Sequence, residues 1–262
     1  MKDVTVNVLY EGTYSVGIDK IFNKINRSDP PAKGALKLSI NPFLIKDRDH
    51  NILFDVGIGD LISEESTIDT ILENLSKYSL TEYDITDIFI SHLHFDHFAG
   101  LANRKSGYWD LTFPEAVIWV SEEGWKDLND ALDKKPDEYQ ELVHFLNMRG
   151  DIRFLIHDAN PIPPIRIEKI GGHTEHHLAL FYMNGDHRYL MAGDVLGRRS
   201  AVNKNFLAKF DYDPKQSMDA RNRLMEYALQ EKYTIMAYHE TDFPLFNLID
   251  YSSKEGYTIE NV

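Results

Sequence analysis

The sequence predicts an α/β protein, because short apolar strands and amphipathic helices follow one another along most of the chain. Residues 4–9 alternate apolar and polar side chains, as a half-buried strand does, whereas the apolar residues of 66–77 recur at helical spacing. With 262 residues, of which 43% are hydrophobic, the chain has enough apolar material for one substantial core. We therefore expect a single domain that spans residues 1–262.

The first third of the chain contains mainly strands. Its predicted elements are strands at 4–9, 36–45, 51–57 and 87–92 and a helix at 66–77. Residues 10–35 stand apart, because glycines and prolines interrupt any apolar pattern there. We predict an irregular segment over 10–35, and long loops of this kind often cap a functional site.

Helices and strands also alternate through the rest of the chain. A strand at 116–120 leads into a helix with Ser121 as its N-cap, and the next helix, 136–148, has Pro136 near its start. The proline-rich stretch 160–165 is expected to be a loop within the domain. The remaining predicted elements are strands at 152–156, 165–170, 177–183, 188–192 and 233–239 and a helix at 214–232.

The composition argues against several classes of function. A formal net charge of −14 disfavours binding to nucleic acids or to anionic membranes, which relies on clustered Lys and Arg. The absence of cysteine excludes disulfides, thiolate zinc sites and a cysteine nucleophile. The N-terminus lacks the apolar stretch of a signal peptide, and no apolar run is long enough to span a bilayer. We predict a cytoplasmic protein that acts on a small molecule.

One short stretch is dense in side chains that bind metals. SHLHFDH, residues 91–97, holds His92, His94, Asp96 and His97 directly after an apolar run. Alternate residues of an extended segment point to one side, so the two first histidines can aim together while a turn brings the other two ligands to a second position. Imidazole and carboxylate bind zinc, iron, manganese or cobalt. Four ligands in six residues exceed what one ion usually takes from one loop, so the pattern predicts two adjacent ions.

Two ions need further ligands, and three candidates follow at the ends of later predicted strands. They are His173 in GGHT, Asp194 in MAGD and His239 in AYHE. Functional residues of α/β folds commonly gather at strand ends. A pair of ions roughly 3.5–4 Å apart would make hydroxide available at neutral pH and polarise the oxygen of the bond to be cleaved.

The order H-x-H-x-D-H, GH, GD and a late histidine resembles the metallo-β-lactamase superfamily. FDVG (54–57) and TFPEAVIWVSEEGWKDL (112–128) resemble its lactonase-like hydrolase branch, and the whole resemblance covers roughly residues 36–240. It implies a four-layer αβ/βα sandwich, with two mixed β-sheets flanked by helices. It also implies a binuclear metallohydrolase that cleaves a small ester, lactone or related carbonyl substrate. The alternatives are hydrolysis of a phosphodiester or phosphotriester, or an iron-dependent oxidoreductase on the same scaffold.

The resemblance also implies roles for individual residues, with a hydroxide between the ions as nucleophile. Asp96 and Asp194 would be the catalytic carboxylates. Asp55 matches a carboxylate that orients a ligand histidine from behind, and His177 is expected to support the ligands in a similar way. The resemblance divides the ligands between two ions, with His92, His94 and His173 on one, Asp96, His97 and His239 on the other, and Asp194 bridging them.

The substrate side of the site is less strongly indicated. Arg198 would suit an anionic group, and Phe22, Tyr108 and Phe206 could line an apolar pocket. Gly197 stands where many acyl-homoserine lactonases carry a tyrosine, which turns the expectation toward other small esters and lactones. The cofactors are expected to be two divalent ions, zinc first, with iron, manganese or cobalt as alternatives. A homodimer is the candidate assembly.

Overall fold

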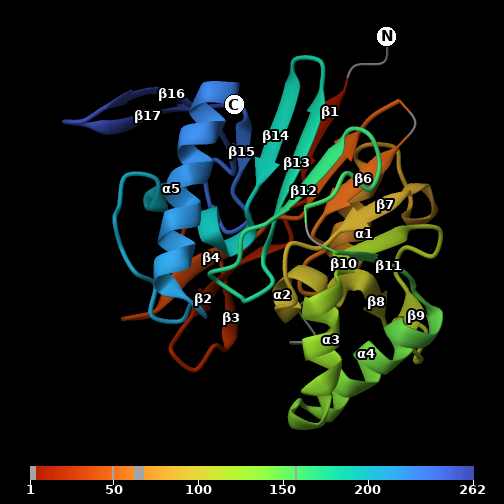
Figure 1. The fold of residues 1–262 in the computed structure, drawn as a ribbon. Coiled ribbons are helices and arrows are strands. Elements are labelled where there is room, and N and C mark those ends of the chain that lie inside the picture. The colour runs from red at the N-terminus through yellow and green to blue at the C-terminus, as the bar shows by residue number, and fades with distance from the viewer. Residues whose placement is uncertain (1–3, 49, 62–67, 157) are drawn as a thin grey trace. The chain divides into compact units, whose positions relative to one another are not determined.

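The computed structural model describes residues 4–48, 50–61, 68–156 and 158–262 (Figure 1). The chain forms two units, unit 1 (Met1–Phe154) and unit 2 (Leu155–Val262), and each is described by itself. Within the described residues, each unit is built on a six-stranded sheet that has both parallel and antiparallel pairs and carries helices. The predicted α/β class with two mixed, helix-flanked sheets is confirmed, whereas a single domain over 1–262 stays a prediction.

The unit-1 sheet brings two polar strand ends to one edge. β6, β7 and β10 are parallel neighbours, with Phe54 opposite Phe89. Asp55 and Ser91 come just after the ends of β6 and β7, so both lie at the carboxyl edge of the sheet. In spatial order the strands are β1 (Thr5–Val8), β5 (Phe43–Lys46), β6 (Asn51–Phe54), β7 (Asp87–Phe89), β10 (Val117–Ser121) and β11 (Asp151–Leu155).

The helices of unit 1 follow local sequence signals. The Ser121 hydroxyl accepts a hydrogen bond from the Gly124 amide at 3.3 Å and caps α3, which confirms the predicted cap. α1 confirms the predicted helix from Asp69 onward, while residues 66–67 of that prediction lie outside the described residues. The elements are α1 (Asp69–Ser76), α2 (Phe95–Phe98), α3 (Glu122–Asp130), α4 (Asp137–Arg149), η1 (Glu82–Asp84), η2 (Ala99–Leu101), η3 (Leu132–Lys134), β8 (Ala102–Asn103) and β9 (Asp110–Leu111).

Two predictions in the first third are wrong. Residues 10–35 are not irregular, because β2 (Gly12–Val16) and β3 (Phe22–Ile25) form a hairpin that pairs with β4 (Leu36–Ile40) in the order β3-β2-β4. Most of the glycines and prolines that suggested a loop lie in the turns outside these strands. The predicted strand 36–45 is two strands in two sheets, β4 and β5. The chain breaks at Pro42, which has no amide hydrogen for a strand ladder.

Unit 2 combines its sheet with one long helix, α5 (Pro214–Glu231), which packs on β16. Asp213 caps α5 by accepting hydrogen bonds from the Lys215 and Gln216 amides at 3.0 and 2.9 Å. Neither α5 nor any other helix in the described part of the chain is long and apolar enough to cross a membrane. The other elements, with strands in spatial order, are β12 (Ile165–Lys169), β13 (Leu178–Asn184), β14 (His187–Met191), β15 (Thr234–Met236), β16 (Leu245–Ser252), β17 (Gly256–Asn261), η4 (Gly193–Leu196) and η5 (Arg199–Ala201).

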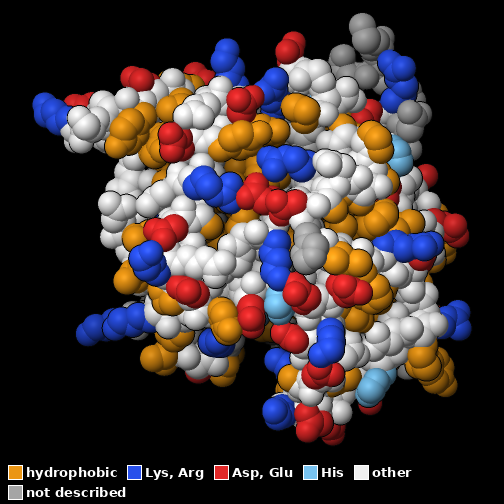
Figure 2. Space-filling model, in the orientation of Figure 1, with side chains coloured by type: hydrophobic (Ala, Val, Ile, Leu, Met, Phe, Trp, Pro, Cys, Tyr) orange, Lys and Arg blue, Asp and Glu red, His pale blue; other side chains and the backbone are white. Residues whose placement is uncertain are grey.

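The hairpin β16–β17 is absent from the sequence predictions, which end with a strand at 233–239. β16 pairs with β15 only up to Asn247, but its pairing with β17 continues to Ser252. The far half of the hairpin therefore projects beyond the sheet, as Figure 1 shows, and Figure 2 shows apolar side chains there. Ile249 and Tyr251 are 52% and 55% exposed. Exposed apolar side chains mixed with polar ones give a weak strand pattern, which explains why this hairpin was missed.

Candidate metal-ligand clusters

Residues 91–98 of unit 1 run from a strand end through an extended stretch into a one-turn helix. β7 ends at Phe89, and His94, in extended backbone, is the N-cap of α2. The His97 amide donates to the His94 carbonyl at 3.0 Å and closes the turn. His92 and His94 thus lie two residues apart before the turn, and Asp96 and His97 lie on it. We call these four residues the unit-1 cluster.

The donor atoms of the unit-1 cluster lie close together. His92 Nε2 is 3.0 Å from His94 Nδ1, and the ring centroids of His92 and His97 are 4.0 Å apart. Asp96 Oδ2 lies 3.7 Å from His97 Nε2. His92, Asp96 and His97 are buried. Three imidazoles and a carboxylate at such distances form a donor set that suits zinc, iron or manganese.

Asp55 orients two histidines of the unit-1 cluster. Its buried carboxylate accepts hydrogen bonds from the Ser91 amide and hydroxyl, both at 2.7 Å, and from His97 Nδ1 at 2.6 Å. Because the Ser91 hydroxyl donates to Asp55, its oxygen can accept from His92 Nδ1, 3.1 Å away. Both rings then carry their lone pair on Nε2, the nitrogen available to a cation. Burial raises the pKa of Asp55, while His97 and the hydrogen bonds oppose this rise.

The loop that carries Asp55 is tied directly to the backbone of His97. The Val56 amide donates to the His97 carbonyl at 2.9 Å, and the Gly100 amide donates to the Gly57 carbonyl at 3.3 Å. A Cβ on Gly100 would lie 2.0 Å from the Val56 carbonyl oxygen, so only glycine permits this approach. Asp55 itself has φ +56°, a left-handed conformation that is uncommon outside glycine.

His173, Asp194 and His239 lie together in unit 2, and we call them the unit-2 cluster. Asp194 follows β14 and His239 follows β15, and these strands are parallel neighbours, so both residues lie at one sheet edge. Asp194 Oδ2 is 3.1 Å from His173 Nε2, and Asp194 Oδ1 is 2.9 Å from His239 Nε2. One carboxylate oxygen thus faces each imidazole nitrogen, which is the geometry of a carboxylate able to bridge two cations.

His173 follows a glycine turn that packs on α5. Gly172 has φ +92°, and a Cβ there would lie 2.5 Å from the Ser217 Cα, so the loop needs glycine at this position. On the far side of the ring, His173 Nδ1 is 2.7 Å from Asp211 Oδ1. Burial lowers the pKa of His173, but the carboxylates of Asp194 and Asp211 outweigh this effect and raise it to about 9.

The family model of the metallo-β-lactamase superfamily matches residues 36–239, well over half of the chain. The chain belongs to the metallo-β-lactamase superfamily. This match confirms the predicted superfamily and fold class. It also confirms the prediction that the protein is a metallohydrolase. The matched range contains every residue of the unit-1 and unit-2 clusters.

Solved structures of similar fold align with nearly the whole chain. A probable metal-dependent hydrolase from Staphylococcus aureus is 21% identical, with a TM-score of 0.76 over 100% of this chain and 99% of that one. AidC, a dizinc quorum-quenching lactonase, is 19% identical, with a TM-score of 0.75 over 99% and 95%. The hydrolase AbOPH is 21% identical, with a TM-score of 0.76 over 100% and 95%. At these identities the likeness shows the fold. No curated protein matches the chain.

The donors of both clusters fit the metal ions of the superfamily. All are imidazole nitrogens or carboxylate oxygens, the ligand types that zinc, iron and manganese share. His97 and His173 each place Nδ1 against a carboxylate and so direct Nε2 away from it. Carboxylate-backed histidines are the usual form of imidazole ligands in metal centres.

The two aromatic residues of unit 1 that are predicted to contact substrate differ in their surroundings. Phe22, in β3, packs its ring against Phe95 at 5.1 Å between centroids, directly beside Asp96 of the unit-1 cluster. Tyr108 is 81% exposed in the turn before β9. Phe22 therefore lies next to the unit-1 cluster, whereas the side chain of Tyr108 is mostly exposed to solvent. The substrate contacts of both stay predictions.

The corresponding residues of unit 2 differ in their relation to the unit-2 cluster, and among these described residues only His177 has a ring contact with one of its members. His177 donates from Nε2 to the Ala192 carbonyl at 3.0 Å, and its ring is 5.6 Å from that of His173. Arg198 is the N-cap residue of η5, four residues after Asp194. Phe206 lies in the loop before α5 and does not follow any strand end. Their roles toward ligands and substrate stay predictions.

Two residues that touch candidate ligands are missing from the sequence analysis. Ser91 directly precedes His92, so its position in the chain could have suggested a supporting role. Asp211 is 38 residues from His173 and lies in a loop. No fixed spacing links a loop residue to a strand end, so the sequence carried no signal for it.

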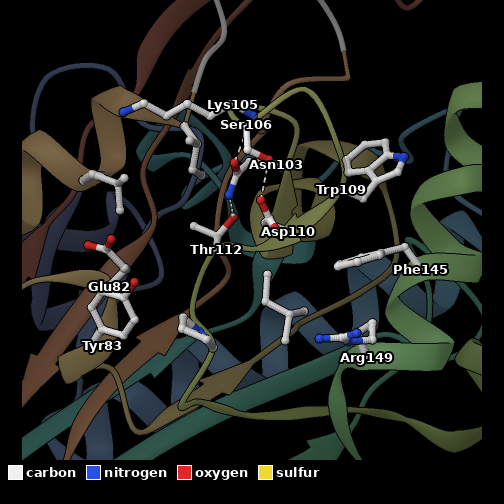
Figure 3. A pocket seen from close by; sticks show the side chains of 14 residues that line it. Glu82, Tyr83, Asn103, Lys105, Ser106, Trp109, Asp110, Thr112, Phe145 and Arg149 are labelled. Atoms are coloured by element: carbon white, nitrogen blue, oxygen red, sulfur yellow. Dashed lines mark hydrogen bonds between the residues drawn. The ribbon is translucent and has the colours of Figure 1, made fainter.

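A separate pocket of about 690 Å³ lies in unit 1 between α1, α4 and the β8–β9 segment (Figure 3). Trp109 stacks on Phe145 along one wall, with centroids 6.4 Å apart, and Arg149 lies beside them. Glu82 and Tyr83 lie on the opposite side, and between the two sides Asn103 donates to the Thr112 hydroxyl at 3.2 Å. Among the described residues that line this pocket there is no member of the unit-1 cluster, so the pocket is distinct from those ligands.

Proposed function

We propose that the protein is a metal-dependent hydrolase in which the unit-1 and unit-2 clusters together hold two divalent ions, with zinc as the expected metal. The substrate class is a small ester, lactone or related carbonyl compound. Asp194 would bridge the ions, and the six other ligands are divided as follows: His92, His94 and His173 on one ion, and Asp96, His97 and His239 on the other.

The observation that carries the proposal is the geometry of Asp194. Its two oxygens face two different imidazole nitrogens at 3.1 and 2.9 Å, so a single carboxylate can serve two ions. Membership of the metallo-β-lactamase superfamily supports the same reading. The carboxylates of Asp55 and Asp211 accept hydrogen bonds from Nδ1 of His97 and His173, which would direct Nε2 of each ring toward the ions.

When bound, a pair of divalent ions would lower the pKa of water toward about 7 and polarise the scissile carbonyl. The protein contributes orientation and proton acceptance. Asp96, buried beside His97, is the carboxylate we assign to accept the proton of the attacking water. Phe22, packed on Phe95, provides an apolar wall next to Asp96 that would exclude bulk water.

The metal content of ligand variants tests the shared centre. We expect two ions per chain in the wild-type protein, measured by inductively coupled plasma mass spectrometry. His94→Ala in unit 1 and His173→Ala in unit 2 should each lose at least one ion and most of the hydrolysis. His144→Ala is the matched control, because His144 is exposed on α4 and lies outside both clusters. If either ligand variant keeps two ions, the two clusters do not form one centre.

A substrate panel tests the reaction class. Lactones, aryl esters, thioesters and phosphodiesters or phosphotriesters are offered to the metal-loaded protein. Faster turnover of carbonyl substrates supports the proposal, whereas preference for phosphoesters would move the activity to the alternative class. Stoichiometric iron together with oxygen consumption would replace the hydrolase by an oxidoreductase. The cytoplasmic location and the homodimer stay predictions.

A further inference from the structure

Asp211 is placed to hold the imidazole of His173 from behind. Its side chain is only 8% exposed, and Oδ1 lies 2.7 Å from His173 Nδ1. The opposite nitrogen, Nε2, faces Asp194 at 3.1 Å. A carboxylate in this position selects the tautomer with its hydrogen on Nδ1 and raises the basicity of Nε2.

We propose that Asp211 is a positioning residue for His173. The inference rests on the proposed function, because it takes His173 as a metal ligand. It adds to unit 2 the counterpart of Asp55, which is 2.6 Å from His97 in unit 1.

Backbone hydrogen bonds fix the segment of Asp211 beside the histidine. The Tyr212 amide donates to the His173 carbonyl at 3.1 Å, and the Asp213 amide donates to the Gly172 carbonyl at 2.8 Å. These two bonds hold residues 212–213, which follow Asp211, alongside residues 172–173. The 2.7 Å contact between the side chains therefore follows from the backbone path.

Arg221 supports the same loop from α5. It is 2% exposed, it donates from Nη2 to the Phe206 carbonyl at 3.0 Å, and its guanidinium carbon lies 4.3 Å from the centre of the Phe206 ring. Burial lowers the pKa of Arg221, and attraction to Asp211 opposes this. A buried guanidinium needs such compensation, because an uncompensated charge in the interior is costly. Arg221 thus holds the start of the loop that leads to Asp211, at Phe206.

The expected effect of Asp211 is on metal affinity. Removing a carboxylate behind a ligand histidine typically costs 10–100-fold in affinity. Asp211→Asn keeps an oxygen that can accept from Nδ1 but removes the charge, so its loss should be near 10-fold. Asp211→Ala removes both and should lose nearer 100-fold.

The test uses the full chain loaded with cobalt or zinc and titrated with a competing chelator. Asp211→Asn and Asp211→Ala should weaken binding in that order and alter the cobalt d–d absorption spectrum, which a purely structural role would leave unchanged. The control is Asp219→Asn, which removes an exposed carboxylate on α5 that pairs with Lys215. Equal affinity and an equal spectrum in wild type and Asp211→Ala would overturn the proposal.

His173→Ala distinguishes failure of the proposed function from failure of the present inference. If this variant leaves the number of bound ions unchanged, the proposed function fails. If it loses metal and Asp211→Ala does not, only the present inference fails.

Discussion

Glu11 of unit 1 is a buried carboxylic acid, and we predict that it makes the protein less stable as the pH rises. Its side chain lies under the loop that follows Asp55, where Oε2 accepts a hydrogen bond from the Ile58 amide at 2.9 Å. A Cβ on Gly57 would lie 2.0 Å from the same oxygen, which shows how closely the loop covers the carboxyl group. Burial raises the pKa of Glu11 to about 8, although the Ile58 and Gly59 amides oppose the rise. Of the nearby charges, Lys24 lowers this pKa and Asp60 raises it.

The direction of this pH effect follows from the difference in proton binding between the folded and the unfolded chain. Between its ordinary pKa of 4.5 and about 8, Glu11 is protonated in the folded chain and ionised in the unfolded chain. The folded chain therefore binds more protons, and the free energy of unfolding falls as the pH rises through this window. Each pKa unit is worth ~1.4 kcal/mol, so the whole fall amounts to about 5 kcal/mol. The stabilising contribution is complete below 4.5 and lost above 8.

Glu11→Gln tests this account, because glutamine keeps the size and an acceptor oxygen for the Ile58 amide but does not ionise. Urea denaturation of wild type and variant would be compared from about pH 5 to about pH 9. The variant should gain about 4 kcal/mol relative to wild type across this range, since part of the fall has already occurred at pH 5. Glu115→Gln, at an exposed position, measures the effect of removing any carboxylate from a chain of net charge −14. A difference that stays constant with pH would refute the reasoning.

Three further predictions concern glycine, capping and ligand support. Gly172→Ala should cost about 2 kcal/mol or more, because a Cβ at φ +92° would lie 2.5 Å from the Ser217 Cα; its fall in melting temperature should exceed that of Gly34→Ala, where nothing lies within 4 Å. Asp213→Ala should lower the free energy of unfolding by about 1 kcal/mol in urea denaturation, because α5 loses its N-cap, and an unchanged midpoint would contradict this. Ser91→Ala should weaken metal binding by about 10-fold in chelator competition, because its hydroxyl joins the buried Asp55 to the candidate ligand His92. Unaltered affinity would count against this link.

The candidate ligands could be predicted from the sequence because they obey short-range rules. His92, His94, Asp96 and His97 fall within six residues, where backbone periodicity alone decides which side chains can meet. His173, Asp194 and His239 needed the order of motifs in the superfamily as well. By contrast, Asp211 contacts His173 from a loop 38 residues away, and its position depends on backbone hydrogen bonds that only the folded chain reveals.

The strands that were missed share a physical feature. β2 is buried but contains Gly12, Thr13 and Ser15, β3 is half-exposed, and the outer half of β16 is exposed. Polar and apolar residues mix in these strands, so the hydrophobic pattern that identifies a core strand is weak in them. The buried strands β6, β7, β10, β13 and β14 were found because burial leaves a clear apolar run.

The hydrogen bonds that orient the candidate ligand histidines form inside each unit. Asp55 holds His97 within unit 1 and Asp211 holds His173 within unit 2, at 2.6 and 2.7 Å. Ions that bind to rings already held in position do not have to bear the entropy of ordering them, which favours tight binding. The left-handed backbone of Asp55 costs of order 1–3 kcal/mol and persists only because its surroundings hold it. Stability and metal affinity are therefore linked at Asp55: a change that relaxes this backbone also releases the histidine that the carboxylate orients.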